Sequence, residues 1–352
     1  MLQKLYCVMF LTLGMGLQAC SSQDESSSLN FFHDELEGSP IAPRYNGADN
    51  SWDCGYFKLS SVQVKSRLDN ARNLPLFYSD DAINRIAKNP CVMTAEASHR
   101  GDVDFAPQNT LPAIDLAVDH GARFIEIDVY LNANNAPIVL HDSNYVKERP
   151  LVPSGFNQVS GPTEACYGKN FETDDWKVMK TCDVSRNNPN YDMERVPLLR
   201  EVLAAYGDTE AIFLGEMKRS SNMKRLGQRV SELLMKYVPN PSQRWVTSFE
   251  EEALDAVDPE INKVRVVRID HVGLALKNII ANGSDKGYDM FVTDISSLNE
   301  EMVAFAADYG AGYGAYTLTK TKPYHHYAAL RVGGVIHITD RLKDFRKLIG
   351  VD

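Results

Sequence analysis

From residue 91 onward, short apolar runs alternate with stretches of helical periodicity. This alternation favours a parallel β-sheet whose strands are joined by helices. The helical stretches include residues 111–120, 222–237, 250–257 and 300–309. The eight candidate strands are residues 92–98, 124–130, 211–218, 244–249, 264–269, 290–293, 314–318 and 335–339. Strands and helices in this number predict an α/β fold, a TIM (β/α)8 barrel over residues 91–352, rather than an open sheet.

Residues 143–195 interrupt this pattern. They are polar, rich in Asn, Pro and Gly, and lack a clear period. A loop of this length inside a compact barrel usually carries function. We therefore interpret the segment as an insertion after the second strand of the barrel.

The first residues have the pattern of a bacterial export signal. Lys4 precedes an apolar run, residues 5–16, that is too short to span a bilayer. The following Leu17-Gln18-Ala19-Cys20 resembles a lipobox, which predicts a signal peptide at residues 1–19 and lipidation of Cys20. A buried N-terminal helix is the alternative, but it does not explain the Leu-x-Ala-Cys ending. We expect an exported protein held on a bacterial membrane by acyl chains, in the periplasm or on the cell surface.

Residues 20–90 lie between this signal and the predicted barrel. Residues 21–50 are rich in Ser, Asp, Glu, Gly and Pro, a composition typical of a flexible tether. Residues 51–90 are a mixed lead-in with one expected helix at residues 79–88. We therefore expect the lipid-anchored tether and lead-in to precede a single barrel.

The overall charge restricts the partners of this chain. The 352 residues are enough for one barrel of about 250 residues, and their net charge is −10. An acidic chain of this kind argues against a nucleic-acid surface built on general positive charge. A small phosphate substrate is still possible, because it needs only a few local cations.

Four cysteines remain if Cys7 leaves with the signal and Cys20 carries lipid. They are Cys54, Cys91, Cys166 and Cys182. An even number in an exported chain suggests disulfides, with three possible pairings. Sequence order favours Cys54–Cys91 and Cys166–Cys182. A zinc site is the alternative, although no Cys-x-x-Cys pair supports it.

Acidic residues gather at the ends of two candidate strands. Glu126 and Asp128 are two residues apart on one strand, so their side chains share a face and both point into the barrel. Glu216 can join them from the neighbouring strand. Three converging carboxylates predict a divalent cation, and all-oxygen ligation favours Mg²⁺ or Ca²⁺. The alternative is that one of these acids only pairs with Lys218 or Arg100.

Two histidines and two cations lie at the same strand ends. His99 closes the first strand, and His141 closes a short apolar run, residues 137–140. Imidazole titrates near about pH 6.5, so one histidine can take a proton while the other gives one. Arg100 and Lys218 are the best-placed cations for a phosphate group, although either could be part of a structural ion pair.

Six short motifs in this region together resemble one enzyme family, the glycerophosphodiester phosphodiesterases. They are His99-Arg100-Gly101, Pro107-Gln108-Asn109-Thr110, Glu126-Ile127-Asp128-Val129, His141-Asp142, Gly215-Glu216-Met217-Lys218 and Ile338-Thr339-Asp340-Arg341. The resemblance extends from residue 91 to the C-terminus. It implies a TIM barrel, a divalent metal held by Glu126, Asp128 and Glu216, and an acid–base pair of His99 and His141. It also implies release of glycerol 3-phosphate and an alcohol from a small glycerophosphodiester.

Three positions depart from the family pattern. Gln108 stands where the family usually has Glu, Tyr316 where it has Trp, and Leu342 where a proline often ends the last motif. These departures put the substrate preference in doubt. Two other functions therefore remain open. One is a phospholipase-D-like activity on lysophospholipids or sphingomyelin, and the other is a non-catalytic barrel that binds a surface partner.

Overall fold

The computed structural model describes residues 43–54, 58–91, 94–142, 166, 168–185, 190–191, 193–319, 322 and 324–349. Eight parallel strands form a closed barrel, in the order β4-β12-β11-β10-β9-β8-β7-β5, and β5 pairs with β4 to close it. The strands are β4 (Ala95–His99), β5 (Phe124–Leu131), β7 (Ile212–Met217), β8 (Arg244–Ser248), β9 (Asn262–Val266), β10 (Met290–Asp294), β11 (Gly312–Leu318) and β12 (Ile336–Thr339). The predicted TIM barrel is therefore confirmed.

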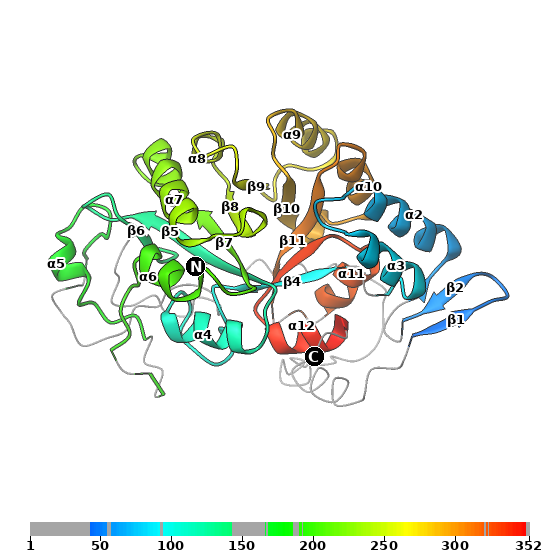
Figure 1. Ribbon diagram of the computed structural model, residues 1–352, viewed down its shortest axis with the longest axis horizontal. Helices are drawn as coiled ribbons and strands as arrows, with labels where there is room; N and C mark the ends of the chain where they lie inside the picture. Colours follow the sequence, from blue (N-terminus) through cyan, green and yellow to red (C-terminus); the bar gives the residue numbers. More distant parts are fainter. Residues whose placement is uncertain are drawn as a thin grey trace, which may run out of the picture. The chain divides into compact units, whose positions relative to one another are not determined.

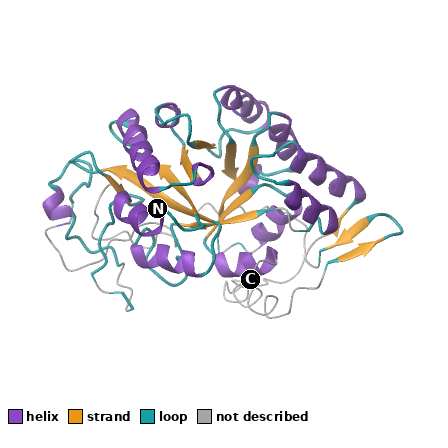
Figure 2. Ribbon diagram, viewed as in Figure 1, coloured by secondary structure: helices purple, strands orange, loops and turns teal. Residues whose placement is uncertain are grey.

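Helices surround the barrel and connect its strands (Figures 1 and 2). They are α4 (Leu111–Asp119), α6 (Leu199–Tyr206), α7 (Met223–Tyr237), α8 (Glu251–Asp255), α9 (Gly273–Asp285), α10 (Glu300–Asp308), α11 (Tyr324–Val332) and α12 (Leu342–Ile349), with short 3-10 turns η2 (Pro241–Gln243) and η3 (Ile295–Ser297). Successive side chains of a strand point to opposite faces, so one face of each strand packs against these helices. On β5, Ile125, Ile127 and Val129 join the core under these helices, while Phe124 belongs to a second core inside the barrel.

Two helices before the barrel close its N-terminal end. They are α2 (Ser61–Arg72) and α3 (Asp80–Lys88), and their apolar residues share a core with the inner face of the strands. The helix at 79–88 was expected, but α2 was not. Its sequence has few apolar residues, so its periodicity is weak, and a capping box formed by Ser60 and Gln63 starts it instead. The lead-in is therefore part of the barrel unit.

A small antiparallel sheet lies beside α2. It contains β1 (Arg44–Asn46), β2 (Ser51–Asp53) and β3 (Lys58–Leu59), and the Cys54–Cys91 disulfide joins it to the start of the barrel. The expectation of a tether up to residue 50 is wrong for β1 and the turn that follows it. The pairing of β1 with β2 supplies backbone hydrogen bonds that composition alone does not reveal.

The insertion has a partly described structure. Strand β6 (Pro137–Val139) pairs antiparallel with β5, and the segment after it contains α5 (Trp176–Met179) and the Cys166–Cys182 disulfide. Phe171 and Met179 form a small separate core with Ile138. Residues 143–165, 167, 186–189 and 192 of the predicted insertion lie outside the described residues. Both predicted disulfides are confirmed.

The predicted signal peptide and Cys20 also lie outside the described residues, which begin at residue 43. Within the described part of the chain, no helix combines the length and the apolar character needed to cross a bilayer.

Candidate active site

The turn after β4 has a backbone that most residues avoid. Arg100 and Gly101 both have positive φ angles, of 62° and 83°. A Cβ atom on Gly101 would lie 2.6 Å from the carbonyl carbon of Ala113, so only glycine fits beside α4. The turn directs the Arg100 backbone N–H to Glu126 Oε2 at 3.0 Å and places its Nε 2.9 Å from Asp128 Oδ2. The His-Arg-Gly motif therefore joins β4 to the acids on β5.

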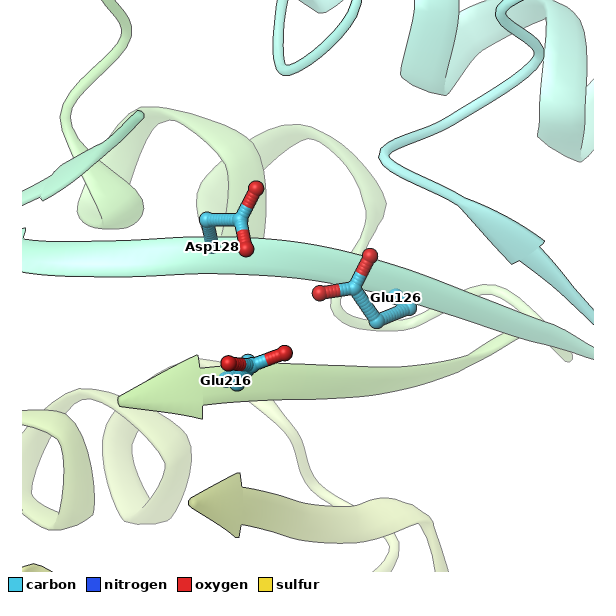
Figure 3. A group of neighbouring side chains, drawn as sticks. All are labelled: Glu126, Asp128 and Glu216. Atoms are coloured by element: carbon cyan, nitrogen blue, oxygen red, sulfur yellow. The ribbon is translucent and has the colours of Figure 1, made fainter. Parts of the chain in front are cut away.

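Three carboxylates converge at the C-terminal end of the barrel. Asp128 is paired in register with Glu216 on the next strand, and Glu126 precedes Asp128 by one strand repeat. Figure 3 shows Glu126 and Asp128 on one strand and Glu216 on the strand beside it. One oxygen from each of the three carboxylates lies within 4.8 Å of the other two. The strand period therefore brings together the three acids expected to converge.

Two cations lie against these acids. Arg100 pairs with Asp128, and Lys218 Nζ lies 2.9 Å from Asp128 Oδ1 and 2.5 Å from Glu216 Oε1. The ion pairs considered from the sequence as an alternative to metal binding are thus present. However, two cations cannot neutralise three carboxylates. Among these contacts, the side chains of the two cations pair with Asp128 and Glu216 but not with Glu126.

The pKa values show the same imbalance. Burial raises the pKa of Glu126 well above its ordinary value, and the charges of Asp128 and Glu216 raise it further. Burial also acts on Asp128, but the cations of Arg100 and Lys218 outweigh it and hold its pKa well below the usual range. Glu126 therefore lacks a positive partner that Asp128 has.

This arrangement fits a divalent cation. The Oε1 atom of Glu126 is buried and accepts no hydrogen bond from any residue that the structure describes. A buried carboxylate oxygen without a partner is costly, and a bound cation would satisfy it. The three acids offer only oxygen ligands, which Mg²⁺ and Ca²⁺ prefer. The three acids therefore fit the divalent cation that was expected from the sequence.

Two amide side chains hold this cluster in place. Asn109 Nδ2 donates to Asp128 Oδ2 at 2.7 Å, and the Asp128 backbone N–H donates to Asn109 Oδ1 at 3.1 Å. Asn109 has a positive φ of 58°, which asparagine tolerates better than most residues. Gln108 Oε1 accepts a hydrogen bond of 3.0 Å from the Arg100 guanidinium. Gln108 therefore contacts Arg100 although it is neutral and stands where the family usually has Glu.

His99 is oriented by an acid from the last strand. Its Nδ1 lies 2.6 Å from Asp340 Oδ1, while its Nε2 lies 4.0 Å from Glu126 Oε2. A ring that donates from Nδ1 keeps Nε2 available to accept a proton. Burial lowers the pKa of His99, and the charge of Arg100 lowers it further. Neutral imidazole at this position suits a general base.

His141 follows β6 at the edge of the same site. Its Nδ1 lies 3.1 Å from Asp142 Oδ1, so a carboxylate stands beside each of the two histidines. Both His141 and His99 interact electrostatically with Asp128, which places both rings near the acidic cluster. The structure thus brings all seven polar candidate residues to one end of the barrel.

The roles of Asn109 and Asp340 were not assigned from the sequence, although both lie in motifs that had been noted. Their spacing gave no indication of a partner, because Asn109 lies in a loop and Asp340 is 241 residues from His99. A motif at the end of the last strand is a usable signal, because that strand is the neighbour of the first in a closed barrel.

A model of the glycerophosphoryl diester phosphodiesterase family matches residues 99–343. The chain belongs to the glycerophosphoryl diester phosphodiesterase family. The matched range begins at His99 and includes every acid, cation and histidine of the site described above.

Two individual proteins are similar to this chain, with identities of 24% and 31%. The chain is 24% identical over 250 residues to a glycerophosphodiester phosphodiesterase of Bacillus subtilis, covering 68% of this chain and 81% of that protein. It is 31% identical over 137 residues to the Bacillus subtilis protein YhdW, and this match spans 39% of the chain but only half of YhdW.

A solved phosphodiesterase of Oleispira antarctica, in complex with the product sn-glycerol-3-phosphate, has a TM-score of 0.59 at 20% identity, covering 73% of this chain and 97% of that one. A glycerophosphodiester phosphodiesterase structure from Agrobacterium tumefaciens has a TM-score of 0.55 at 21% identity, covering 72% and 99%. At these identities the structures support the fold alone.

Proposed function

We propose that this family member hydrolyses glycerophosphodiesters to glycerol 3-phosphate and an alcohol, with a divalent cation held by Glu126, Asp128 and Glu216. One observation carries the proposal. Buried carboxylates converge beside two cations and two carboxylate-paired histidines at the C-terminal end of a TIM barrel. This is the end at which TIM-barrel enzymes place their active sites. The relative from Oleispira antarctica was solved with glycerol 3-phosphate, a product of this reaction class.

The proposed reaction is an in-line displacement at phosphorus. His99 Nε2 accepts the proton of the attacking oxygen, from water or from the glycerol 2-hydroxyl of the substrate, and Asp340 holds the ring in position. His141 donates a proton to the oxygen of the leaving alcohol. The family resemblance favours attack by the internal hydroxyl, which passes through a cyclic phosphate that water then opens. The lowered pKa of His99 favours it as base and leaves His141 as acid.

The cations contribute through charge. Arg100 and Lys218 already lie at the edge of the acidic cluster, within reach of a phosphate held there. Their donors stabilise the negative charge that develops on the phosphoryl oxygens. A bound Mg²⁺ or Ca²⁺ would withdraw charge from the same oxygens as a Lewis acid.

Removal of metal tests the proposal. Dialysis against EDTA should abolish hydrolysis of glycerophosphocholine, and Mg²⁺ or Ca²⁺ should restore it. Glu126→Gln should weaken metal binding, measured by calorimetry, and excess metal should partly rescue its activity. Full activity after exhaustive stripping of metal would contradict the proposal. Release of an acylated glycerol phosphate from lysophospholipids, without any action on glycerophosphocholine, would favour the phospholipase-D-like alternative instead.

We further propose that Cys20 is lipidated and holds the enzyme on a bacterial membrane. The lipobox-like sequence before Cys20 supports this proposal. Cys20→Ala should abolish incorporation of labelled fatty acid while leaving the turnover of soluble substrate unchanged. Labelling that persists in this variant would show that another residue carries the lipid.

A further inference from the structure

The loop between β9 and α9, together with the first turn of α9, carries three large aliphatic side chains that face solvent. Ile269, Val272 and Leu274 are 60%, 59% and 73% exposed. They lie within six residues of the chain, and we call this exposed apolar segment the 269–274 loop. Single exposed apolar residues are ordinary on protein surfaces. Three on one short loop usually mark a site of interaction.

This loop lies at the active-site end of the barrel. It follows the C-terminal end of β9, and the hydrogen bond from the His271 N–H to the Arg268 carbonyl closes a turn with Ile269 at its tip. Just before the turn, the Val267 carbonyl accepts a hydrogen bond of 2.9 Å from the Tyr316 hydroxyl. Tyr316 in turn packs edge-on against Phe249 at the end of β8, with ring centroids 5.8 Å apart. The start of the loop is therefore held by the Tyr316–Phe249 pair at the active-site end of the barrel.

The start of α9 is also unusual. Its N-cap residue is Val272, which makes no side-chain capping hydrogen bond, and its first turn has no acidic residue. Exposed helices usually begin with Ser, Thr, Asp or Asn, whose oxygens accept the free backbone N–H groups. Here the free N–H groups of a 13-residue helix emerge next to aliphatic side chains and the exposed Arg268. The same turn contains Asp270, whose Oδ1 lies 3.2 Å from His271 Nδ1.

We propose that the 269–274 loop docks the enzyme on the surface of a phospholipid bilayer, with the barrel mouth facing the lipid. Aliphatic side chains have no hydrogen-bonding groups, so they match acyl chains rather than a polar partner. The free N–H groups at the start of α9 and the exposed Arg268 flank these side chains along the chain, where phosphate groups of the lipids would meet them. Apolar side chains bordered by phosphate-binding groups match the two layers of a bilayer surface.

The lipid anchor proposed at Cys20 would independently hold the enzyme near a membrane. If Cys20 carries the lipid, 22 residues separate it from Pro43, the first described residue. A chain of this length can extend to at most about 80 Å, compared with about 30 Å for the diameter of a small domain. The anchored barrel could therefore turn its mouth toward the same bilayer. Docking itself does not require hydrolysis, so its test is independent of the catalytic proposal.

Hydrogen exchange of the full chain, with and without equimolar phosphatidylcholine–phosphatidylglycerol vesicles, tests docking at the level of single segments. We expect vesicles to slow the exchange of amides in residues 269–276 by roughly tenfold or more, because lipid replaces water around exposed N–H groups. The triple variant Ile269→Ser, Val272→Ser, Leu274→Ser should lose this protection. Any contribution from residues 1–20 is the same in both proteins and falls on a different segment.

A matched control uses an exposed aliphatic residue at the other end of the barrel. Val62 on α2 is 75% exposed, and Val62→Ser should leave the vesicle-induced protection unchanged. His99→Ala should also retain it, which separates docking from catalysis. The triple variant should keep the wild-type kcat/KM for soluble glycerophosphocholine. A fall in that value would assign the loop to the substrate and overturn the proposal, and so would equal protection in wild type and triple variant.

Discussion

The two ends of the barrel use the same strands for opposite purposes. On β5, Phe124 at the N-terminal end joins the inner apolar core, whereas Glu126 and Asp128 further along the same face are charged. On β7, Leu214 and Glu216 repeat this change. At one end the inward side chains therefore exclude water and ions, and at the other they concentrate negative charge.

The polar residues that hold the two ends of the barrel together also differ. At the N-terminal end, the buried Arg67 donates to the carbonyls of Pro90, Leu330 and Arg331, so its charge ties α2 to α11 and holds the closure in place. At the mouth, Arg100 and Asn109 adopt positive φ angles, and Glu126 keeps an oxygen without a hydrogen-bond partner among the described residues. Strained backbone and unsatisfied groups of this kind are typical of functional sites. The comparison indicates that stability is concentrated at one end and chemistry at the other.

The largest effect should come from the histidines at the mouth. His99→Ala or His141→Ala should lower kcat by roughly 10²–10⁴, the usual contribution of a positioned acid or base, without changing metal affinity. Steady-state kinetics and calorimetry measure the two quantities. His120→Gln is the matched control, because His120 pairs with Asp102 outside the acidic cluster. If both alanine variants lose metal and excess metal rescues them, the histidines are ligands and the mechanism is wrong.

A substrate with a nitrophenol leaving group assigns the two roles. Such a leaving group needs little help from a general acid, so only the histidine that acts as acid should become dispensable. We expect this to be His141.

At the opposite end, loss of the Cys54–Cys91 disulfide should affect folding but not chemistry. It closes a segment with a sequence separation of 37, so Cys54→Ser with Cys91→Ser should lower the free energy of unfolding by about 4 kcal/mol. The separation of 16 for Cys166–Cys182 predicts about 3 kcal/mol for the second pair. Urea denaturation measures both. A lower kcat in the folded Cys54/Cys91 variant would contradict the separation of the two ends.

A smaller catalytic effect is expected for the acid behind His99. Asp340→Asn should lower kcat by roughly 10- to 100-fold, because the amide no longer fixes the ring or its tautomer, while KM stays close to that of the wild type. The double variant with His99→Ala should be no slower than His99→Ala alone, because both changes remove the same function. Additive losses would show that Asp340 acts independently of His99.

An effect that is small at neutral pH concerns a histidine that is buried but lies outside the site. Burial, and then the charge of His326, lowers the pKa of His337 to about 3. Because the folded state resists protonation below the unfolded value of 6.5, stability should fall as the pH drops from there toward 3, by up to about 1.4 kcal/mol per pH unit. Urea titrations of wild type and His337→Gln should show a shallower acid limb in the variant. Equal slopes would contradict this prediction.

Features that depend on the local spacing of apolar and charged residues could be predicted from the sequence. Alternation of apolar runs predicted all eight barrel strands, and the two-residue spacing of Glu126 and Asp128 predicted that they converge. Prediction from the sequence failed for elements that are stabilised by contacts with other parts of the chain and lack a clear apolar pattern of their own. Helix α2 is held by a capping box and by the carbonyl contacts of Arg67, and β1 by its pairing with β2. The contact between His99 and Asp340 could not be predicted from local spacing, because it depends on barrel closure.

Closure also determines when the enzyme can act at its full rate. His99 ends the first barrel strand and Asp340 follows the last, and these two strands are hydrogen-bonded neighbours, with Ile336 opposite Ala95. Contacts this far apart in sequence form late, after most of the chain has been made. In the proposed mechanism, His99 lacks its orienting carboxylate until β12 has paired with β4. The proposed mechanism therefore reaches its full rate only when the last strand has joined the first, which makes activity a report on closure of the whole barrel.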